Sequence, residues 1–588
     1  MNMRWSLEEL YTSFESDKFR DDVSKYDKCI NDLKKWASEN LVDANRAAEK
    51  IEKYIKMKSE FYNLYIKLSD YSELTLSVDA KNEKAAAASE EIDSKYTELT
   101  EVDVNFEKWL ASLEHLAEIL DSSNFIKEHE FYLKELIERN KYLLSEKEEI
   151  VVAKMMNTGS NAWSKLQNTV TSNLLVDIVI KDEEKKLPLP VVRNMAYSND
   201  AETRKIAYEA ELKAYKKMEE ASAAALNGIK GEVITVSKLR GYESPLEETL
   251  INSRLDKQTL EAMLTAMKES LPSFRKFYLK KANKLGHKKG LPFYDLFAPT
   301  GESDMRFTYE EARDFVVKNF RTFSEKLADF ADNAFEKRWI DAEPREGKRG
   351  GAFCSNIHPI GESRIMSNFT GSFSDVATLA HELGHGYHGS CLMEESYLNS
   401  RYTMPIAETA SIFCETIVKN AALKNASKGE AYTILEGDIS DSAQVIVDIY
   451  SRYLFETELF KRREKASLSV NELKEIMLKA QKEAYGEGLD ENYLHPYMWV
   501  CKPHYYYAGQ NFYNFPYAFG LLFSKGLYAE YLRRGESFVN DYDKLLSVTG
   551  KNKIADVTAL MDIDIHSVDF WRSSLKLIEK DIEKFVSL

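Results

Sequence analysis

The sequence is poor in cysteine, proline and glycine. Its 588 residues include only five cysteines. No two of them have the Cys-x-x-Cys spacing of a cysteine zinc site, and their scattered, odd number does not support a disulfide framework. Glycine occurs 24 times and proline 12 times, below ordinary usage. Because both residues interrupt helices, their shortage favours a mainly helical protein. A chain of this length buries enough apolar surface to fold without disulfides or metal, so we expect any metal site to serve chemistry.

Basic residues are not in excess, and no apolar run reads as a membrane span. The chain has 80 lysines and arginines against 96 aspartates and glutamates, a net charge of −16. This balance argues against a nucleic-acid groove, because neutralising phosphates requires a basic face. The segment from Pro503 to Ser524 lacks charged residues, but its histidine, glutamine, asparagines and proline are costly in hydrocarbon. Residues 1–9 contain no apolar stretch typical of a signal peptide. We therefore expect a cytoplasmic protein with no nucleic-acid or membrane partner; no pattern indicates an oligomeric state.

Several common catalytic motifs are also missing. There is no Gly-x-x-x-x-Gly-Lys-Ser/Thr loop for phosphates and no Gly-x-Ser-x-Gly nucleophile elbow. Gly486 and Gly488 are followed by Glu491 where the dinucleotide-binding fingerprint requires a third glycine. These absences argue against a P-loop, a hydrolase with a serine elbow and a dinucleotide-binding site.

The order of patterns along the chain predicts two helical domains. Successive amphipathic helical patterns fill the first third of the chain, up to a charged, proline-containing segment at Lys181–Pro190. We therefore expect an N-terminal helical domain over residues 1–185 and a second domain over 190–588. A short β-prone patch near Ser363–Thr370 interrupts the helical pattern of the second domain. The predicted fold class is mainly α with a small β-sheet.

The motif His381-Glu382-Leu383-Gly384-His385 has the spacing of metal ligands on a helix. Positions i and i+4 lie on one face of a helix, so His381 and His385 can bind one zinc ion. Glu382 lies about 100° around the helix from His381, beside the position that a catalytic zinc leaves open. The alternative is an exposed helix that carries two histidines and binds nothing.

A third ligand is needed, because catalytic zinc usually takes three protein ligands and a water. The metzincin pattern requires glycine and histidine at the positions of His388 and Cys391, so that class is excluded. The other arrangement supplies a glutamate from a following helix. Glu408, 23 residues beyond His385 in a segment opened by a proline, fits this arrangement.

Two further residues are candidates for a supporting role. Glu415 lies two turns beyond Glu408 and would anchor a ligand histidine from behind; the alternative is a solvated helix glutamate. His388 follows His385 by three residues and stays near the metal face. Instead of a supporting role, His388 could contact the substrate or simply pack in the interior.

Several segments together resemble a known family of peptidases. The segments 381–388 and 408–415 resemble the zinc region of the thimet oligopeptidase superfamily, and more closely its bacterial branch, oligoendopeptidase F. Further similar segments are 294–299, 350–354 and 367–371. The resemblance runs from about residue 200 to the C-terminus. Residues before it fit the family's helical extension by length and character only.

The resemblance implies a zinc-dependent endopeptidase that hydrolyses internal bonds of short, unstructured oligopeptides. It implies one Zn²⁺ per chain on His381, His385 and Glu408, with Glu382 as the general base that activates a zinc-bound water. It also implies a two-lobed helical fold with the site in a deep central channel, and the β-prone patch predicts a small sheet near the active site. Alternative readings are a metallocarboxypeptidase or dipeptidyl carboxypeptidase and, from a different class, an inactive helical peptide-binding scaffold.

An aromatic segment, residues 504–517, is the second candidate catalytic region. Peptide hydrolysis develops negative charge on the carbonyl oxygen, and a tyrosine hydroxyl or histidine can stabilise that oxyanion. The family's C-terminal motif pairs a histidine with tyrosines at the scissile carbonyl, and His504 and Tyr517 match its two ends. Tyr506 and Tyr513 are further candidates for substrate contact. The alternative for most of these aromatics is core packing.

Overall fold

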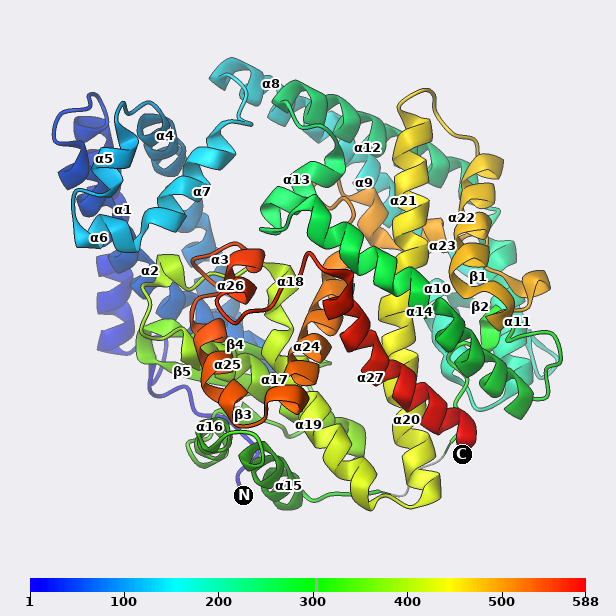
Figure 1. The fold of residues 1–588 in the computed structure, drawn as a ribbon. Helices are drawn as coiled ribbons and strands as arrows, with labels where there is room; N and C mark the ends of the chain where they lie inside the picture. Colours follow the sequence, from blue (N-terminus) through cyan, green and yellow to red (C-terminus); the bar gives the residue numbers. More distant parts are fainter. Residues whose placement is uncertain (302–304) are drawn as a thin grey trace. The chain divides into compact units, whose positions relative to one another are not determined.

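The computed structural model describes residues 1–301 and 305–588 and is mainly helical (Figure 1). Its contacts divide the chain into two compact units, each assembled from three stretches. Unit 1 comprises Met1–Tyr142, Met305–Ala422 and Glu530–Asp562; unit 2 comprises Leu143–Asp304, Leu423–Ala529 and Ile563–Leu588. The mainly helical fold expected from composition is confirmed. The division into 1–185 and 190–588 stays a prediction, because the compact units follow contacts rather than chain order.

Unit 1 begins with a run of helices around an aromatic core. They are α1 (Asp17–Asn40), α2 (Ala47–Val78), α3 (Glu83–Thr97), α4 (Thr100–Ala111), α5 (Leu116–Leu120), α6 (Asn124–Glu128) and α7 (Glu130–Asn140). Tyr26 and Phe61 stack with their ring centroids 5.2 Å apart, and the core around them buries apolar residues of α1, α2 and α4. Burial of this apolar area stabilises the helices far more than their intrinsic propensity does.

The rest of unit 1 surrounds a three-stranded sheet. Its elements are α15 (Tyr309–Arg321), α16 (Glu325–Glu336), β3 (Ile340–Asp341), β4 (Phe353–Ile357), β5 (Glu362–Met366), α17 (Phe373–Cys391), α18 (Met404–Ala407), α19 (Thr409–Asn425, which begins in unit 1), α25 (Ser537–Ser547) and α26 (Ile554–Ala559). The strand order is β3-β5-β4, with β3 parallel and β4 antiparallel to β5. The β-prone patch thus includes the central strand. Both β4 and β5 contact α17.

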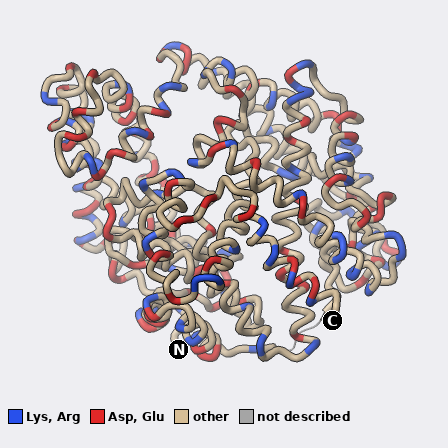
Figure 2. The backbone as a smooth tube through the Cα atoms, viewed as in Figure 1, with Lys and Arg blue, Asp and Glu red and all other residues tan. Residues whose placement is uncertain are grey.

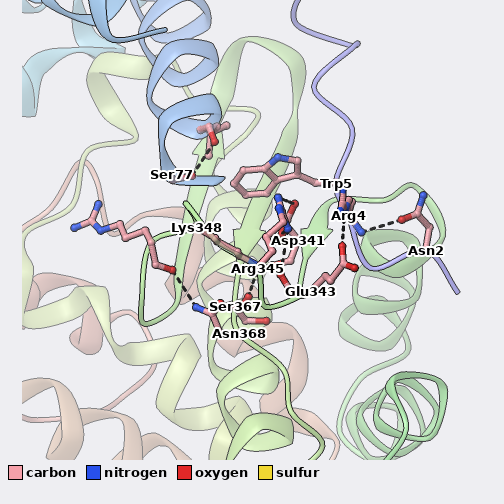
Figure 3. Close-up of polar contacts among 12 residues, drawn as sticks. Asn2, Arg4, Trp5, Ser77, Asp341, Glu343, Arg345, Lys348, Ser367 and Asn368 are labelled. Atoms are coloured by element: carbon pink, nitrogen blue, oxygen red, sulfur yellow. Dashed lines mark hydrogen bonds and ion pairs between the residues drawn. The ribbon is translucent and has the colours of Figure 1, made fainter. Parts of the chain in front are cut away.

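A network of ion pairs and hydrogen bonds fixes the loop that leads into β4 (Figure 3). Asp341 pairs with Arg345 at 2.7 Å and with the buried ammonium of Lys348 at 2.7 Å. Lys348 also donates to the carbonyl of Ser367 at 2.6 Å. Asn368 donates to the carbonyl oxygens of residues 349 and 351, at 3.0 Å each. These contacts hold the edge strand β4 in a defined position beside α17.

Unit 2 contains a two-stranded hairpin and long helices. Its elements are α8 (Glu146–Thr158), α9 (Ser160–Ser172), β1 (Leu175–Ile180), β2 (Glu183–Pro188), α10 (Leu189–Asn194), α11 (Ala201–Tyr215), α12 (Glu219–Arg240), α13 (Pro245–Asn252), α14 (Lys257–Lys284), α20 (Lys428–Ala443), the π-helical turn η5 (Gln444–Asp448), α21 (Ile449–Arg463), α22 (Val470–Tyr485), α23 (Met498–Cys501), the 3₁₀ turn η8 (Pro503–Tyr506), α24 (Phe515–Arg534, which ends in unit 1) and α27 (Val568–Ser587). Helices α14 and α27 pack along each other.

The segment read as a boundary, 181–190, forms part of this hairpin. Its charge and prolines predict a domain boundary; in the structure, β1 and β2 pair in antiparallel register from Leu175–Pro188 to Ile180–Glu183. Lys181 and Asp182 make the two-residue turn with φ of 51° and 64°. Left-handed values at both turn residues match the twist of the flanking strands, which is why so charged a sequence can close a hairpin.

Basic and acidic residues are interspersed along both units in the view of Figure 2. Lys and Arg alternate with Asp and Glu along the backbone (Figure 2). Within residues 1–301 and 305–588, every helix is too short or too polar to cross a bilayer.

Candidate metal centre

Helix α17 presents the histidine motif, and its start is fixed by a capping box. The hydroxyl of Ser372 accepts from the amide of Asp375 at 3.1 Å, and the Asp375 carboxylate accepts from the amide of Ser372 at 3.0 Å. The same carboxylate accepts from the amide and hydroxyl of Thr370. Because these bonds satisfy otherwise unpaired groups at the helix start, they set the register in which His381 and His385 share one face.

The three predicted ligands meet in unit 1. The Nε2 atoms of His381 and His385 lie 3.2 and 3.4 Å from the same oxygen of Glu408, Oε2. The two imidazole centroids are 4.9 Å apart. Among the residues that the structure describes, these three form the group of histidine, cysteine and acidic side chains close enough to hold one ion.

This arrangement fits zinc. Ligand atoms about 2.0–2.2 Å from a tetrahedral ion lie roughly 3.4 Å from one another, close to the separations seen here. Two imidazoles and one carboxylate are also a ligand set of catalytic zinc sites. All three side chains are partly exposed, at 26%, 19% and 29%, so a fourth position remains accessible.

Glu408 lies at a junction between two helices rather than inside one. The prediction placed it within a helix opened by Pro405, but α18 ends at Ala407 and α19 begins at Thr409. The Glu408 carbonyl accepts from the amide of Ile412 at 3.2 Å, and its carboxylate oxygen Oε2 accepts from the hydroxyl of Ser411 at 2.7 Å. The break directs the carboxylate toward α17.

Glu415 contacts His381 from behind. Its Oε2 lies 3.2 Å from Nδ1 of His381, on the far side of the ring from Glu408. Such a contact keeps Nε2 free for a metal and orients the ring. Burial acts to lower the pKa of His381, but the hydrogen bonds to Glu408 and Glu415 outweigh it and raise that pKa to about 10. The two carboxylates thus favour a positive charge at this point, which a divalent cation would supply in place of the proton.

Glu382 lies next to the ligands and is 6% exposed. Its Oε2 has no hydrogen-bond partner among the described residues. Burial raises the pKa of Glu382, while the two neighbouring imidazoles oppose that effect. A buried carboxylate without a partner costs free energy, so its retention beside metal ligands indicates a chemical role.

His388 is packed in the interior of unit 1 and lies outside the group of three. Its ring stacks on Tyr402 with centroids 4.1 Å apart, and its Nε2 lies 2.8 Å from the hydroxyl of Thr549. Burial lowers the pKa of His388 to about 3. Of the interpretations left open by the sequence, these contacts favour packing of a neutral imidazole.

Asn356 of β4 supports the site and was missed by sequence reasoning. Its amide donates to the carbonyl of His385 at 3.1 Å, and its Oδ1 accepts from the hydroxyl of Ser363 at 2.7 Å. It ties the sheet to the ligand-bearing turn of α17. No local pattern distinguishes this asparagine, because its role depends on the pairing of β4 with β5.

Gly384 allows α17 to approach the Glu408 segment closely. A Cβ at this position would lie 2.5 Å from the carbonyl oxygen of Ala410 and 2.5 Å from Cα of Ser411. Both contacts are with backbone, which cannot move aside as a flexible side chain would. The absence of a side chain here therefore brings Glu408 within reach of both histidines.

We expect Gly384→Ala to destabilise the chain by about 1–3 kcal/mol, the usual cost of overpacking, and to weaken zinc binding. Urea unfolding and zinc titration measure the two effects. The matched control is Gly437→Ala in α20, where a Cβ meets nothing within 4 Å; alanine should stabilise that helix by roughly 0.5–1 kcal/mol. Equal stability and zinc affinity of the two variants would contradict the close-approach argument.

The aromatic candidates lie in unit 2, and the structure brings three of the four together. The ring of His504 stacks on Tyr513 with centroids 4.7 Å apart, and the hydroxyl of Tyr517 donates to that of Tyr513 at 3.0 Å. Tyr506 is 1% exposed and packs in the interior. Burial, with the nearby cations Arg452 and Lys502, lowers the pKa of His504, which keeps its imidazole neutral.

Comparisons with known proteins agree on a family. Residues 194–577 match the model described as peptidase family M3, and residues 111–174 match the one described as oligopeptidase F. Oligopeptidase PepF of Bacillus subtilis is 24% identical, over 99% of this chain and 87% of its own length. An oligoendopeptidase F homolog of Lactococcus lactis subsp. lactis is 23% identical, over 93% of this chain and 89% of its own.

Solved structures show the same fold. A crystal structure from Chlamydophila abortus superposes with a TM-score of 0.87 at 21% identity, covering 99% of this chain and 98% of the other. Oligoendopeptidase-F from Enterococcus faecium superposes with a TM-score of 0.70 at 17% identity, covering 96% and 98%.

Proposed function

Because the chain belongs to peptidase family M3, we propose that it is a zinc-dependent endopeptidase that hydrolyses internal bonds of short, unstructured oligopeptides. The family makes the chain a peptidase. We further propose that it uses zinc, that the residues have the roles given below, and that it cleaves internal bonds. Cytoplasmic location and the lack of nucleic-acid and membrane partners stay predictions from the sequence.

The observation that carries the proposal is the spacing at Glu408. Two Nε2 atoms from one helix face lie 3.2 and 3.4 Å from a single carboxylate oxygen, the separation that a shared tetrahedral ion requires. A buried carboxylate without a described partner, Glu382, adjoins them. A peptide-binding scaffold has no need of this combination.

When bound, zinc would act as a Lewis acid that polarises the scissile carbonyl and makes water a stronger nucleophile. His381, His385 and Glu408 would hold it, with Glu415 orienting the ring of His381. Glu382 takes the proton of the attacking water and passes it to the leaving amine. Tyr517 donates a hydrogen bond to the oxyanion of the transition state, with His504 and Tyr513 supporting it.

The decisive experiment is digestion of a quenched peptide library with and without a chelator, with the products identified by mass spectrometry. We expect cleavage at internal bonds that chelation stops and zinc restores. The His381→Ala chain, purified in parallel, controls for contaminating peptidases. A second library with amidated C-termini separates the alternatives, because a carboxypeptidase or dipeptidyl carboxypeptidase needs the free carboxylate. Cleavage that persists in chelator, or is lost on amidation, would overturn the proposal.

We expect Tyr517→Phe to lower kcat and kcat/KM together, by about 10²–10³-fold, with KM little changed. The change deletes only the hydroxyl, so the ring keeps its edge-on contact with Tyr513. Steady-state kinetics on one fluorogenic peptide measures the effect. The matched control is Tyr507→Phe, an exposed tyrosine of the same segment. A kcat within a few-fold of wild type, or a raised KM with unchanged kcat, would remove Tyr517 from the catalytic residues.

A further inference from the structure

Unit 2 contains a cavity of about 450 Å³ whose lining includes none of the residues assigned to hydrolysis. It is bordered by α10, α11, α14, the turn η5 and the segment that runs from His495 to Lys502. All of its lining residues belong to unit 2, whereas the three metal ligands belong to unit 1. Pockets for small molecules span roughly 300–1,000 Å³, so this cavity has the size of a ligand site.

Aromatic side chains form part of the cavity wall. Tyr208, Tyr278, Phe293, Tyr294 and Phe297 line it. Tyr208 and Tyr294 lie with their centroids 5.7 Å apart. Such a wall favours an apolar, and above all an aromatic, body of a ligand.

Most of the charged groups in the wall are already neutralised. Each carboxylate or guanidinium that lines the cavity belongs to an ion pair. The pairs are Asp295 with Arg204 at 2.7 Å, Glu211 with Arg193 at 3.4 Å, and Asp448 with Arg452. These pairs leave one cationic side chain of the wall without an ion-pair partner among the described residues.

That side chain is Lys502. Its ammonium makes no hydrogen bond or ion pair with any residue that the structure describes, although it is partly buried. Burial lowers the pKa of Lys502 and the nearby Arg452 lowers it further, while Asp448, which is paired with Arg452, acts to raise it. An ammonium in such surroundings gains most from a bound anion, because three neighbouring carboxylates are already paired.

His495 supplies a second polar group. Its Nε2 lies 3.5 Å from Glu211, which assigns the ring proton to that nitrogen. Its Nδ1 is buried without a hydrogen-bond partner among the described residues. The backbone of His495 is fixed on both sides by Gln481, at 3.0 and 2.7 Å. The imidazole is therefore held rigidly in the wall and presents no exposed acceptor to a ligand.

The turn η5 adds an independent sign of a functional site. Gln444 and Asp448, at its two ends, both line the cavity. A π-helical turn is energetically unfavourable and occurs frequently at functional sites. Here it places the paired Asp448 in the cavity wall near Lys502.

We propose that this cavity binds a small carboxylic acid with an aromatic or aliphatic body, with the carboxylate at Lys502. Peptide hydrolysis releases a carboxylic acid at every cut, so short reaction products belong to this class. The inference concerns a site apart from the metal centre and does not depend on zinc.

Isothermal titration with N-acetyl-L-phenylalanine and its neutral amide tests the proposal. The full chain is treated with chelator, so that the metal centre cannot coordinate the carboxylate. We expect the acid to bind roughly 10- to 100-fold more tightly than the amide, the value of a hydrogen bond to a charged group. Lys502→Met should reduce the affinity for the acid to that for the amide, and Lys502→Arg should retain the preference.

The matched control is Lys213→Met, which replaces an exposed lysine of α11. This variant should bind the acid and the amide with the affinities of the wild-type chain. Equal affinity for acid and amide in the wild-type chain would overturn the proposal, as would a preference that survives in Lys502→Met. Binding is read as heat on the chelated chain. A failure here is therefore distinct from a failure of the proposed peptidase activity, which is measured on the zinc-loaded chain.

Discussion

Replacing His381 by alanine is expected to abolish both zinc binding and peptide hydrolysis while leaving the chain folded. The imidazole faces Glu408 on one side and Glu415 on the other, at 3.2 Å each. Its loss removes one of three ligands and leaves two carboxylates without their shared partner. The fold should survive, because the buried apolar cores of the two units are far larger than the site.

Metal analysis, thermal unfolding and peptide hydrolysis together check this result. The matched control is His115→Asn, at an exposed histidine of unit 1, which should keep zinc, stability and activity. Asparagine is chosen because His115 has a φ of 54°, which asparagine tolerates better than alanine. Full zinc occupancy in His381→Ala would contradict the assignment of His381 as a zinc ligand. Loss of the folded state would show that the site stabilises the chain.

The parts of the site that follow from helix periodicity could be predicted from the sequence. The i, i+4 spacing put His381 and His385 on one face, and the structure places their Nε2 atoms on one oxygen of Glu408. Glu415 was selected on the same geometric ground and lies against Nδ1 of His381. These positions depend on spacing within one helix or between two helices that follow each other in the chain. The sequence is therefore enough to predict which residues come together.

The parts that depend on tertiary contact could not be predicted. The break at Glu408 lies next to the segment that α17 approaches through Gly384, and no pattern around Pro405 signals it. The hairpin β1–β2 was not predicted, because the charge and prolines of residues 181–190 indicate a domain boundary rather than paired strands. Its φ values at Lys181 and Asp182 emerge only once the strands pair. The unmatched charge of Lys502 is likewise visible only when three distant ion pairs are known.

Replacing Glu382 by glutamine is expected to lower kcat by about 10²–10⁴-fold, the usual contribution of a general base. Zinc should stay bound, because Glu382 is not one of the three grouped ligands. Glutamine keeps the size of the side chain but cannot accept the proton of the attacking water. Steady-state kinetics on a fluorogenic peptide, with zinc measured in the same samples, checks the result. The matched control is Glu394→Gln, at an exposed glutamate of unit 1.

The kinetic signature separates a base from a structural carboxylate at position 382. A group that acts only in the transition state lowers kcat and kcat/KM equally and leaves KM unchanged. A buried carboxylate without a described partner is a cost to folding, so glutamine at this position should also leave the free energy of unfolding unchanged or raise it. If Glu382 instead served the fold, the variant would lose stability and keep its turnover. Near-wild-type kcat in a zinc-loaded Glu382→Gln chain would therefore refute the role as general base, whatever its stability.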